Sequence, residues 1–330
     1  MRQSNFELLR IVAIWGIVLH HLIINGISTV GYNQEFHADN NSMSLLFINS
    51  ILVGSVNCFV LISGWFGIKV SIRTIIRLLC DCMIFALTGI LITFFMTNDS
   101  SLLNLSILWD NGKFTHYWFI THYLVLVLIS PVLESSIQNI KYRTFAIWIL
   151  ILIIINVYFG YFLGVVNKDG YNYINFILLY YIGRFLRISQ GQSWMQCLKK
   201  YSLLLSGGVS ILFSIIYTAV SFYKWIPGIR FWSYNSPWVL ISSIFLFIYF
   251  SKFKFKSKIV NIIATGALGI YLLQGVGVFG PIRNHYAILA NNSFGICGLI
   301  IYSIFLFSIL CFISVIINKM LQSLYSKISC

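Results

Sequence analysis

The chain has 330 residues, of which 59% are hydrophobic, 17% aromatic and only 9% charged. This composition is too apolar for an ordinary water-soluble globular domain and indicates an integral membrane protein. The formal net charge is +14 at pH 7. Because most of the basic residues fall in connections on one predicted side of the membrane, we interpret this charge as a topology signal and expect no nucleic-acid partner.

Apolar runs of about twenty residues are typical of membrane-spanning helices, and the alternation expected of a barrel strand is absent. We therefore predict an all-α fold, a polytopic transmembrane helical bundle. The connections are short, so we expect a single membrane domain over residues 1–330 and no soluble domain. Ten spans are expected, at residues 6–25, 44–67, 74–96, 117–134, 144–164, 172–188, 202–222, 237–251, 259–280 and 295–318.

The first span, FELLRIVAIWGIVLHHLIIN, carries Glu7, Arg10, His20 and His21, which are costly to place in hydrocarbon. On a helix that advances about 100° per residue, Arg10 and His21 lie about 20° apart around the axis and roughly 16 Å apart along it. Glu7 falls within about 40° of the same line, whereas His20 points about 80° away from Arg10. We predict that this stripe faces an interior or a passage. The alternative is that Arg10 snorkels to the interface and that His21 is a hydrogen-bonded core imidazole.

The distribution of basic residues predicts that both termini are cytoplasmic. The inner connections contain Lys69, Arg73, Arg77 and the run KFKFKSK. The outer connections hold only Lys113, Lys168, Lys224, Arg230 and Arg283, together with the acids Glu35, Asp39, Asp99, Asp110 and Asp169.

The seven cysteines fall in predicted spans or inner segments, so no disulfide framework is indicated. Zinc-site spacing, a glycine-rich phosphate loop and a serine-nucleophile elbow are all absent from the sequence. We therefore expect no metal and no permanently bound cofactor.

Four segments resemble the membrane acyltransferase-3 family. NFELLRIVAIWGIVLHH is similar to the first helix of that family, in which Arg or Lys is followed after ten residues by His, as Arg10 and His21 are here. CFVLISGWFGIKVSIRTIIRLL, HYWFITHYLVLVLISPVL and GALGIYLLQGVGV resemble later helices, so the likeness runs from end to end. There are two departures. The family pattern Arg-x-x-Arg is replaced by Arg73 and Arg77, four apart, and Gln274 stands where the family often carries a titrating His.

This resemblance implies transfer of an acyl group, commonly acetyl, from cytoplasmic acyl-CoA to a hydroxyl of a surface polysaccharide, such as a capsule or exopolysaccharide, or of a lipid-linked glycan. Acyl-CoA is then a donor substrate. The expected partners are acyl-CoA, the glycan acceptor and membrane lipid, and the expected location is a bacterial plasma membrane.

In the implied mechanism, His21 is the general base, Arg10 positions the donor or stabilises developing oxyanion charge, and Glu7 orients Arg10. His20 remains an alternative base, and a covalent acyl-histidine remains open. The other candidate substrate-binding residues are Arg73 and Arg77 for the CoA phosphates, with Ser63, Trp118 and Gln274.

Each of these further assignments has a structural alternative. The lysines of KFKFKSK, which are Lys252, Lys254, Lys256 and Lys258, would join the arginines at a cationic mouth or simply anchor helices on anionic lipid. Trp118 would stack on a sugar or belong to an interfacial aromatic belt. Ser63 and its neighbour Gly64 would contact a substrate or permit close helix packing.

A rival hypothesis from another functional class is a polytopic transporter or flippase for a glycan or lipid. Its intramembrane Arg and His would line a permeation route. The two hypotheses differ in one respect that can be measured, because only the acyltransferase depends on acyl-CoA.

Overall fold

The computed structural model describes residues 3–27, 40–97, 109–110, 113–114, 117–166, 169–222, 233–275 and 279–328. Within these ranges the chain is almost entirely helical, and one pair of two-residue antiparallel strands joins β1 (Trp109–Asp110) to β2 (Lys113–Phe114). The prediction of an all-helical fold is thus confirmed. The outer acids predicted at Glu35, Asp39 and Asp99 lie outside the described residues.

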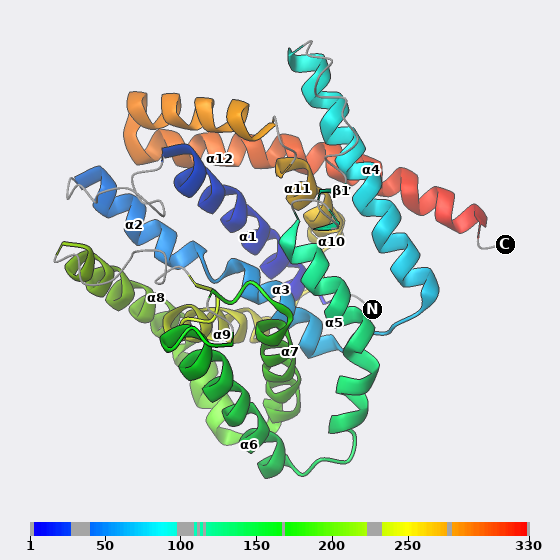
Figure 1. The fold of residues 1–330 in the computed structure, drawn as a ribbon, viewed down its shortest axis with the longest axis vertical. Helices are drawn as coiled ribbons and strands as arrows, with labels where there is room; N and C mark the ends of the chain where they lie inside the picture. Colours follow the sequence, from blue (N-terminus) through cyan, green and yellow to red (C-terminus); the bar gives the residue numbers. More distant parts are fainter. Residues whose placement is uncertain are drawn as a thin grey trace. The chain divides into compact units, whose positions relative to one another are not determined.

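Figure 1 shows the helices in chain order. They are α1 (Ser4–His21), the π-helix η1 (Leu22–Ile27), α2 (Asn40–Leu52), α3 (Ser55–Phe66), α4 (Ile72–Thr97), α5 (Trp118–Ile137), α6 (Tyr142–Ile153), the π-helix η4 (Ile154–Phe162), α7 (Tyr173–Ile188), the short 3₁₀ turn η5 (Ser189–Gly191), α8 (Ser193–Phe222), α9 (Pro237–Ser251), α10 (Lys258–Thr265), α11 (Ala267–Gln274) and α12 (Phe279–Ile328).

Seven of the described helical segments are long and apolar enough to cross a membrane. They are Ser4–Ile27, Ser44–Phe66, Ile72–Ile92, Trp118–Ile137, Tyr142–Phe162, Ser193–Tyr217 and Ile282–Ser326. The remaining predicted spans correspond to shorter helices, namely α7, α9 and the α10–α11 pair. A multi-pass membrane protein is therefore supported, whereas the count of ten spans and the cytoplasmic termini stay predictions.

Contacts along the chain divide it into two compact units. Unit 1 comprises Met1–Ser28, Ser71–Trp118 and Phe255–Cys330, and unit 2 comprises Thr29–Val70 and Phe119–Lys254. Helices α1, η1, α4, α10, α11 and α12 belong to unit 1, and the other helices belong to unit 2, except that α5 begins at the last residue of unit 1. The expected single domain over the whole chain stays a prediction.

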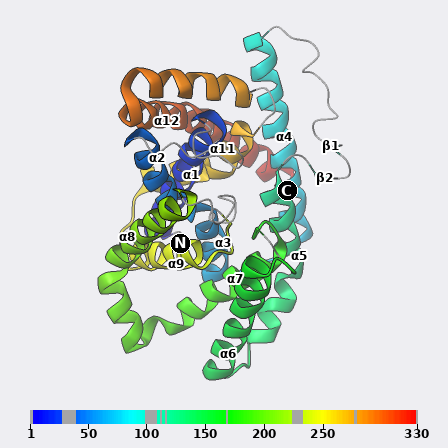
Figure 2. The same cartoon turned by 60° about the vertical axis from the view of Figure 1, so that its left-hand side comes forward.

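In unit 1, α12 is a helical hairpin. Gly295 interrupts it with φ 58° and ψ −150°, a conformation that glycine adopts readily because it lacks a Cβ. The arm before Gly295 folds back along the part after it (Figures 1 and 2), and Tyr302 Oη donates a hydrogen bond to the Arg283 carbonyl oxygen at 3.2 Å. The predicted spans leave residues 281–294 as a connection, and this prediction is wrong, because these residues form the first part of α12.

The ninth predicted span, residues 259–280, is broken at Gly266 into α10 and α11. A break in a membrane helix leaves carbonyl groups that need other partners in apolar surroundings. The Thr265 oxygen accepts from Asn318 Nδ2 of α12 at 2.7 Å, and the Gly266 oxygen accepts from Ser314 Oγ of α12 at 2.8 Å in addition to the Ile270 N–H at 2.9 Å. The broken span is thereby fixed to the last helix.

In unit 2, α3 and α7 approach closely at two glycines. A Cβ built on Gly64 would lie 2.2 Å from the Tyr180 carbonyl oxygen, and one on Gly183 would lie 2.4 Å from the Leu61 oxygen. Any larger residue would therefore push the two backbones apart. The close packing considered for Gly64 is confirmed.

Serine hydroxyls join α2, α8 and α9 elsewhere in unit 2. Ser50 Oγ lies 2.7 Å from Ser214 Oγ, and Ser210 Oγ lies 3.1 Å from Ser242 Oγ. Ser206 Oγ donates to the Ser242 carbonyl oxygen at 3.1 Å. Such small polar side chains let membrane helices pack closely and hold them by interhelical hydrogen bonds.

Candidate functional site

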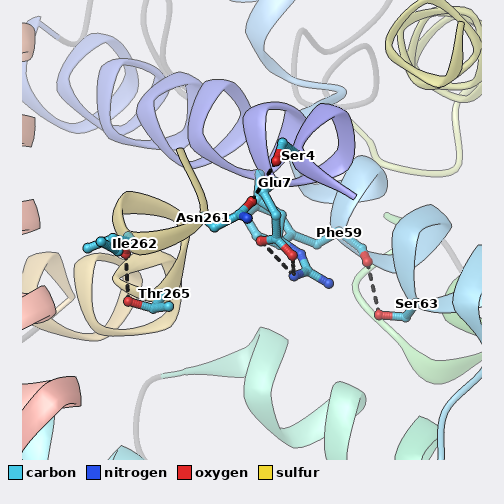
Figure 3. Close-up of polar contacts among 8 residues, drawn as sticks. Ser4, Glu7, Phe59, Ser63, Asn261, Ile262 and Thr265 are labelled. Atoms are coloured by element: carbon cyan, nitrogen blue, oxygen red, sulfur yellow. Dashed lines mark hydrogen bonds and ion pairs between the residues drawn. The ribbon is translucent and has the colours of Figure 1, made fainter. Parts of the chain in front are cut away.

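The first turn of α1 is tied to the start of α10. The Ser257 backbone N–H donates to Ser4 Oγ at 2.9 Å, and Ser4 Oγ donates to Asn261 Oδ1 at 3.0 Å. Figure 3 shows Ser4 next to Asn261. Ser257 also caps α10, because its Oγ accepts from the Val260 N–H at 3.3 Å. The end of the lysine run, at Lys258, is therefore held beside the start of α1.

Glu7 and Arg10 form an ion pair one turn along α1. Arg10 Nη1 lies 2.9 and 3.0 Å from the two carboxylate oxygens of Glu7. The Glu7 side chain is 7% exposed and that of Arg10 is 33% exposed. The pair has the geometry expected if Glu7 orients Arg10, and an acid in the first turn is also favoured by the helix dipole. The roles of the two residues in the reaction stay predictions.

Arg10 and His21 lie on one uninterrupted α-helix, because α1 runs from Ser4 to His21. The angular argument made for an ideal helix therefore applies to this pair. Directly after His21 the chain enters the π-helix η1, and π-helical segments occur often at functional sites. At Gly26, η1 packs against the part of α12 that precedes Gly295. A Cβ built on Gly26 would lie 3.4 Å from the Ala287 Cβ.

The structure brings His21 and Gln274 together from α1 and α11. The His21 imidazole has the Gln274 amide, the His20 ring and the Arg283 guanidinium as neighbours, and the two histidine ring centroids are 5.9 Å apart. Gln274 is 1% exposed, yet neither its Nε2 nor its Oε1 has a hydrogen-bond partner of normal geometry among the described residues. A buried amide without partners is costly, and such a group calls for a functional explanation.

Arg283 is the residue of this cluster that sequence reasoning missed. It is 5% exposed, and its Nη1 donates to the Gln274 carbonyl oxygen at 3.0 Å while its Nε donates to Asn284 Oδ1 at 3.2 Å. Sequence reasoning had counted it only as an outer-side charge. A signal was available, because Arg283, Ala287 and Asn291 are spaced as one helix face, and all three are buried in the structure.

Arg73 and Arg77 both lie on the exposed surface of α4. The Arg77 guanidinium carbon is 5.1 Å from the centroid of the Tyr325 ring, and Tyr325 Oη donates to Asp81 Oδ1 at 2.8 Å. Since they are four residues apart on a helix, the two arginines share a face, as the sequence predicted. Trp118, the first residue of α5, is partly exposed.

Ser63 differs from the other candidates because it lies in unit 2. Its Oγ donates to the Phe59 carbonyl oxygen at 3.0 Å (Figure 3) and lies 3.1 Å from Tyr123 Oη. These bonds occupy the hydroxyl within its own unit. The other seven candidates belong to unit 1, namely Glu7, Arg10, His21, Arg73, Arg77, Trp118 and Gln274.

Two lysines of the run line a cavity in unit 2 with a volume of about 670 Å³. Its lining has four cationic side chains and no carboxylate, which suits a polyanion such as a chain of phosphates. The lining residues are Gln190, Gln196, Lys199, Lys200, Ser251, Lys252 and Lys254.

The described part of the chain holds no group of three or more His, Cys, Asp or Glu side chains that could bind a metal ion. The expectation that the protein needs no metal stays a prediction. The chemistry that these side chains themselves offer is proton transfer at His21 and hydrogen bonding from Gln274 and Arg283.

Comparison with known proteins gave one match. A family model described as an acyltransferase domain matches residues 3–319. No curated protein and no solved structure matched the chain.

Proposed function

Since the chain belongs to the acyltransferase-3 family, we propose that it is a membrane-bound O-acyltransferase. It moves an acyl group, most simply acetyl, from cytoplasmic acyl-CoA to a hydroxyl of a surface polysaccharide or a lipid-linked glycan. The proposed location is a bacterial plasma membrane. The family match does not favour the alternative of a glycan or lipid transporter.

The observation that carries the proposal is the contact between the imidazole of His21 and the buried side-chain amide of Gln274. An imidazole is the usual general base at neutral pH. An amide group has two N–H donors and a carbonyl acceptor, so Gln274 can contact His21 and still offer hydrogen bonds to a polar substrate. The two groups together suit a reaction between a hydroxyl and a carbonyl.

In this reaction the His21 imidazole removes the proton of the acceptor hydroxyl as its oxygen attacks the thioester carbonyl carbon. The tetrahedral intermediate carries an oxyanion, to which Gln274 Nε2 donates a hydrogen bond. The C–S bond then breaks, the CoA thiolate leaves, and the imidazolium returns the proton to it. The products are the acyl ester and free CoA.

Arg10 acts on another part of the donor in this proposal. A separation of roughly 16 Å along the helix prevents Arg10 and His21 from contacting the same carbonyl group. Of the two roles considered for Arg10, donor positioning therefore fits better than oxyanion stabilisation. Glu7 holds the guanidinium in place through its two short contacts, so Glu7 and Arg10 are positioning residues.

The phosphates of CoA need cationic partners on the cytoplasmic side. Arg73 and Arg77 offer two guanidinium groups on one exposed face of α4, and guanidinium groups suit bidentate phosphate binding. The lysine-lined cavity of unit 2 offers a second cationic surface. We assign the arginines to the donor and leave to the lysines the roles of phosphate binding or of contact with anionic lipid.

The adjacent histidines provide a matched test. His21→Ala and His20→Ala are expressed to equal protein levels, and the acetyl content of the surface glycan is measured by NMR. We expect His21→Ala to lower acetylation by about 100-fold or more, because general base catalysis contributes roughly 10²–10⁴-fold, and we expect His20→Ala to retain most of it. Wild-type acetylation in His21→Ala would contradict the mechanism.

Reconstitution separates the enzyme from the transporter. The purified protein in vesicles should transfer label from acetyl-CoA to the glycan and should do nothing when acetyl-CoA is omitted. Movement of glycan across the vesicle membrane without acyl-CoA would support the rival function instead.

A further inference from the structure

The lysine-lined cavity of unit 2, with a volume of about 670 Å³, lies at the end of two packed helices. Its lining comes from η5, from α8 and from the residues where α9 ends. Ser206 Oγ of α8 donates to the Ser242 carbonyl oxygen of α9 at 3.1 Å. Lys199 lies seven residues before Ser206, which is two turns of helix, so it lies on the face of α8 that contacts α9. The cavity therefore lies between α8 and the chain that follows α9.

The positive charge of this cavity is not balanced by a carboxylate of the described residues. None of the ion pairs among these residues involves a lysine. Lys199 and Lys254 come from different elements, and their ammonium groups lie close enough to repel each other. An anion bound between like charges that share a concave surface lowers their electrostatic free energy. The cavity thus suits a ligand with more than one negative charge.

Aromatic rings hold two of these lysines in place without neutralising them. Lys252 Nζ lies 4.1 Å from the centroid of the Tyr249 ring, and Lys200 Nζ lies 5.2 Å from that of Tyr201. A ring attracts a cation through its quadrupole but carries no net charge. The two ammonium groups are therefore positioned and can still pair with an anion. Tyrosines of this kind are also typical of the boundary between membrane and water.

The surface of α8 next to the lysines is apolar. Leu203 and Leu204 follow Lys199 and Lys200 after four residues, so each leucine lies one turn further along the same face. The two leucines are 50% and 75% exposed. Because the apolar segment of α8 that can cross a membrane begins at Ser193, the leucines lie deeper in the membrane than the lysines. A lipid can place its phosphates at the lysines and its hydrocarbon chains along the leucines, whereas a soluble polyphosphate gains nothing from the leucines.

The number and grouping of the lysines determine the head group that fits. Lys199 and Lys200 form one pair on α8, and Lys252 and Lys254 form a second pair beside the end of α9. Each pair can bind one phosphate, so a head group with two phosphates uses both pairs. A lipid with a single phosphate would leave half of the positive charge unbalanced. Basic pockets between membrane helices bind the head groups of such lipids in other proteins.

We propose that this cavity binds an anionic lipid with two phosphates, with one phosphate on each lysine pair and the hydrocarbon chains along Leu203 and Leu204. The bound lipid would hold the first turns of α8 against the end of α9. The proposal does not depend on the proposed acyl transfer, because the cavity contains none of the residues assigned to that reaction. It is a statement about binding and can be measured without acyl-CoA or glycan.

Diphosphatidylglycerol, which has two phosphates, is the probe, and binding of its fluorescent form is measured on the purified full-length protein in detergent. The salt concentration is about 0.15 M, at which exposed charges more than about 8 Å apart are largely screened from each other. Competitors are phosphatidylglycerol, CoA and inorganic pyrophosphate. We expect phosphatidylglycerol to compete about tenfold more weakly than unlabelled diphosphatidylglycerol, because its one phosphate can use only one lysine pair. CoA and pyrophosphate, which have no hydrocarbon chains, should not compete at the same concentrations.

Matched basic residues locate the site. Lys254 lines the cavity, whereas Lys256, two residues further along the same run, is also exposed and is not in the lining. We expect Lys254→Gln and Lys200→Gln each to weaken binding of diphosphatidylglycerol about fivefold. The controls Lys256→Gln and Arg143→Gln should change it by less than about twofold, because their charges lie outside the cavity and are screened. All four positions are exposed, so the variants should unfold at the wild-type temperature in detergent without lipid.

Any of four results would overturn the inference. Equal weakening by Lys254→Gln and Lys256→Gln would mean that the basic run attracts anionic lipid as a surface, without a site. Equal competition by phosphatidylglycerol would remove the requirement for two phosphates. Competition by CoA but not by pyrophosphate would make the cavity a site for the acyl donor, and competition by pyrophosphate would make it a site for soluble anions.

Discussion

Buried and half-buried polar residues of this protein fall into two kinds, according to whether their hydrogen-bonding groups are satisfied. In unit 2, Glu134 accepts a hydrogen bond from Arg184 Nη2 at 2.7 Å and another from Tyr180 Oη. In unit 1, the Gln274 amide is more deeply buried, lies beside the His21 imidazole and has no hydrogen-bond partner of normal geometry among the described residues. A satisfied group stabilises the helices that carry it, whereas an unsatisfied one lowers stability and is explained by binding.

Substitution of one residue of each kind should therefore have opposite effects. We expect Glu134→Gln to lower the free energy of unfolding by about 1–3 kcal/mol, because it weakens two hydrogen bonds and leaves Arg184 without its counter-charge. Gln274→Leu should leave thermal stability unchanged or higher and should lower acetyl transfer strongly. Thermal unfolding in detergent and acetyl transfer are measured on both variants. A Gln274→Leu protein that is fully active would remove Gln274 from the site.

At the scale of the helices, glycines set the distances that assemble the site. Gly269 lies in α11 where this helix contacts α4 and α12, and a Cβ there would lie 2.1 Å from Ser314 Oγ and 2.4 Å from Phe85 Cε1. The same helix ends at Gln274. The position of Gln274 beside His21 therefore depends on a contact one and a half turns away, at a residue with no chemical role.

Gly269→Ala should accordingly lower both stability and activity. Overpacking of this kind costs about 1–3 kcal/mol, and the displaced α11 should carry Gln274 away from His21. The matched control is Gly207→Ala in α8, where nothing lies within 4 Å of the added Cβ. That change should raise stability by about 0.5–1 kcal/mol, because alanine is the better helix former. Equal unfolding temperatures for the two variants would contradict the packing argument.

At the scale of the whole molecule, the candidate residues other than Ser63 come from the three separate stretches of chain that form unit 1, which are the two ends of the sequence and residues 71–118. Glu7 and Arg10 lie near the start of α1, next to the lysine run, and His21 lies at its other end, next to Arg283. If the basic run is cytoplasmic, as the distribution of charge predicts, the Glu7–Arg10 pair lies toward the inner side and His21 lies toward the outer side.

Cysteine labelling tests this orientation. In a background without the native cysteines, Lys256→Cys and His285→Cys place one thiol on each predicted side, and both positions are exposed in the structure. A membrane-impermeant maleimide added to intact cells should label His285→Cys and should spare Lys256→Cys until the cells are opened. The reverse pattern would overturn the orientation and, with it, the assignment of Arg73 and Arg77 to a cytoplasmic donor.

The sequence alone determined that this is an all-helical membrane protein, placed helices at the predicted spans, and singled out Arg10 and His21, because apolar length, helical spacing and charge in an apolar segment are local properties of the chain. Gln274 became a candidate only through the resemblance to the acyltransferase-3 family. Only the tertiary structure decided which of these residues meet. Arg283 meets α11 because Gly295 reverses α12, and the break of the ninth span at Gly266 is stabilised by Ser314 and Asn318 of α12, which donate to the Gly266 and Thr265 carbonyl oxygens. Such contacts depend on partners far away in the chain, which no local pattern specifies.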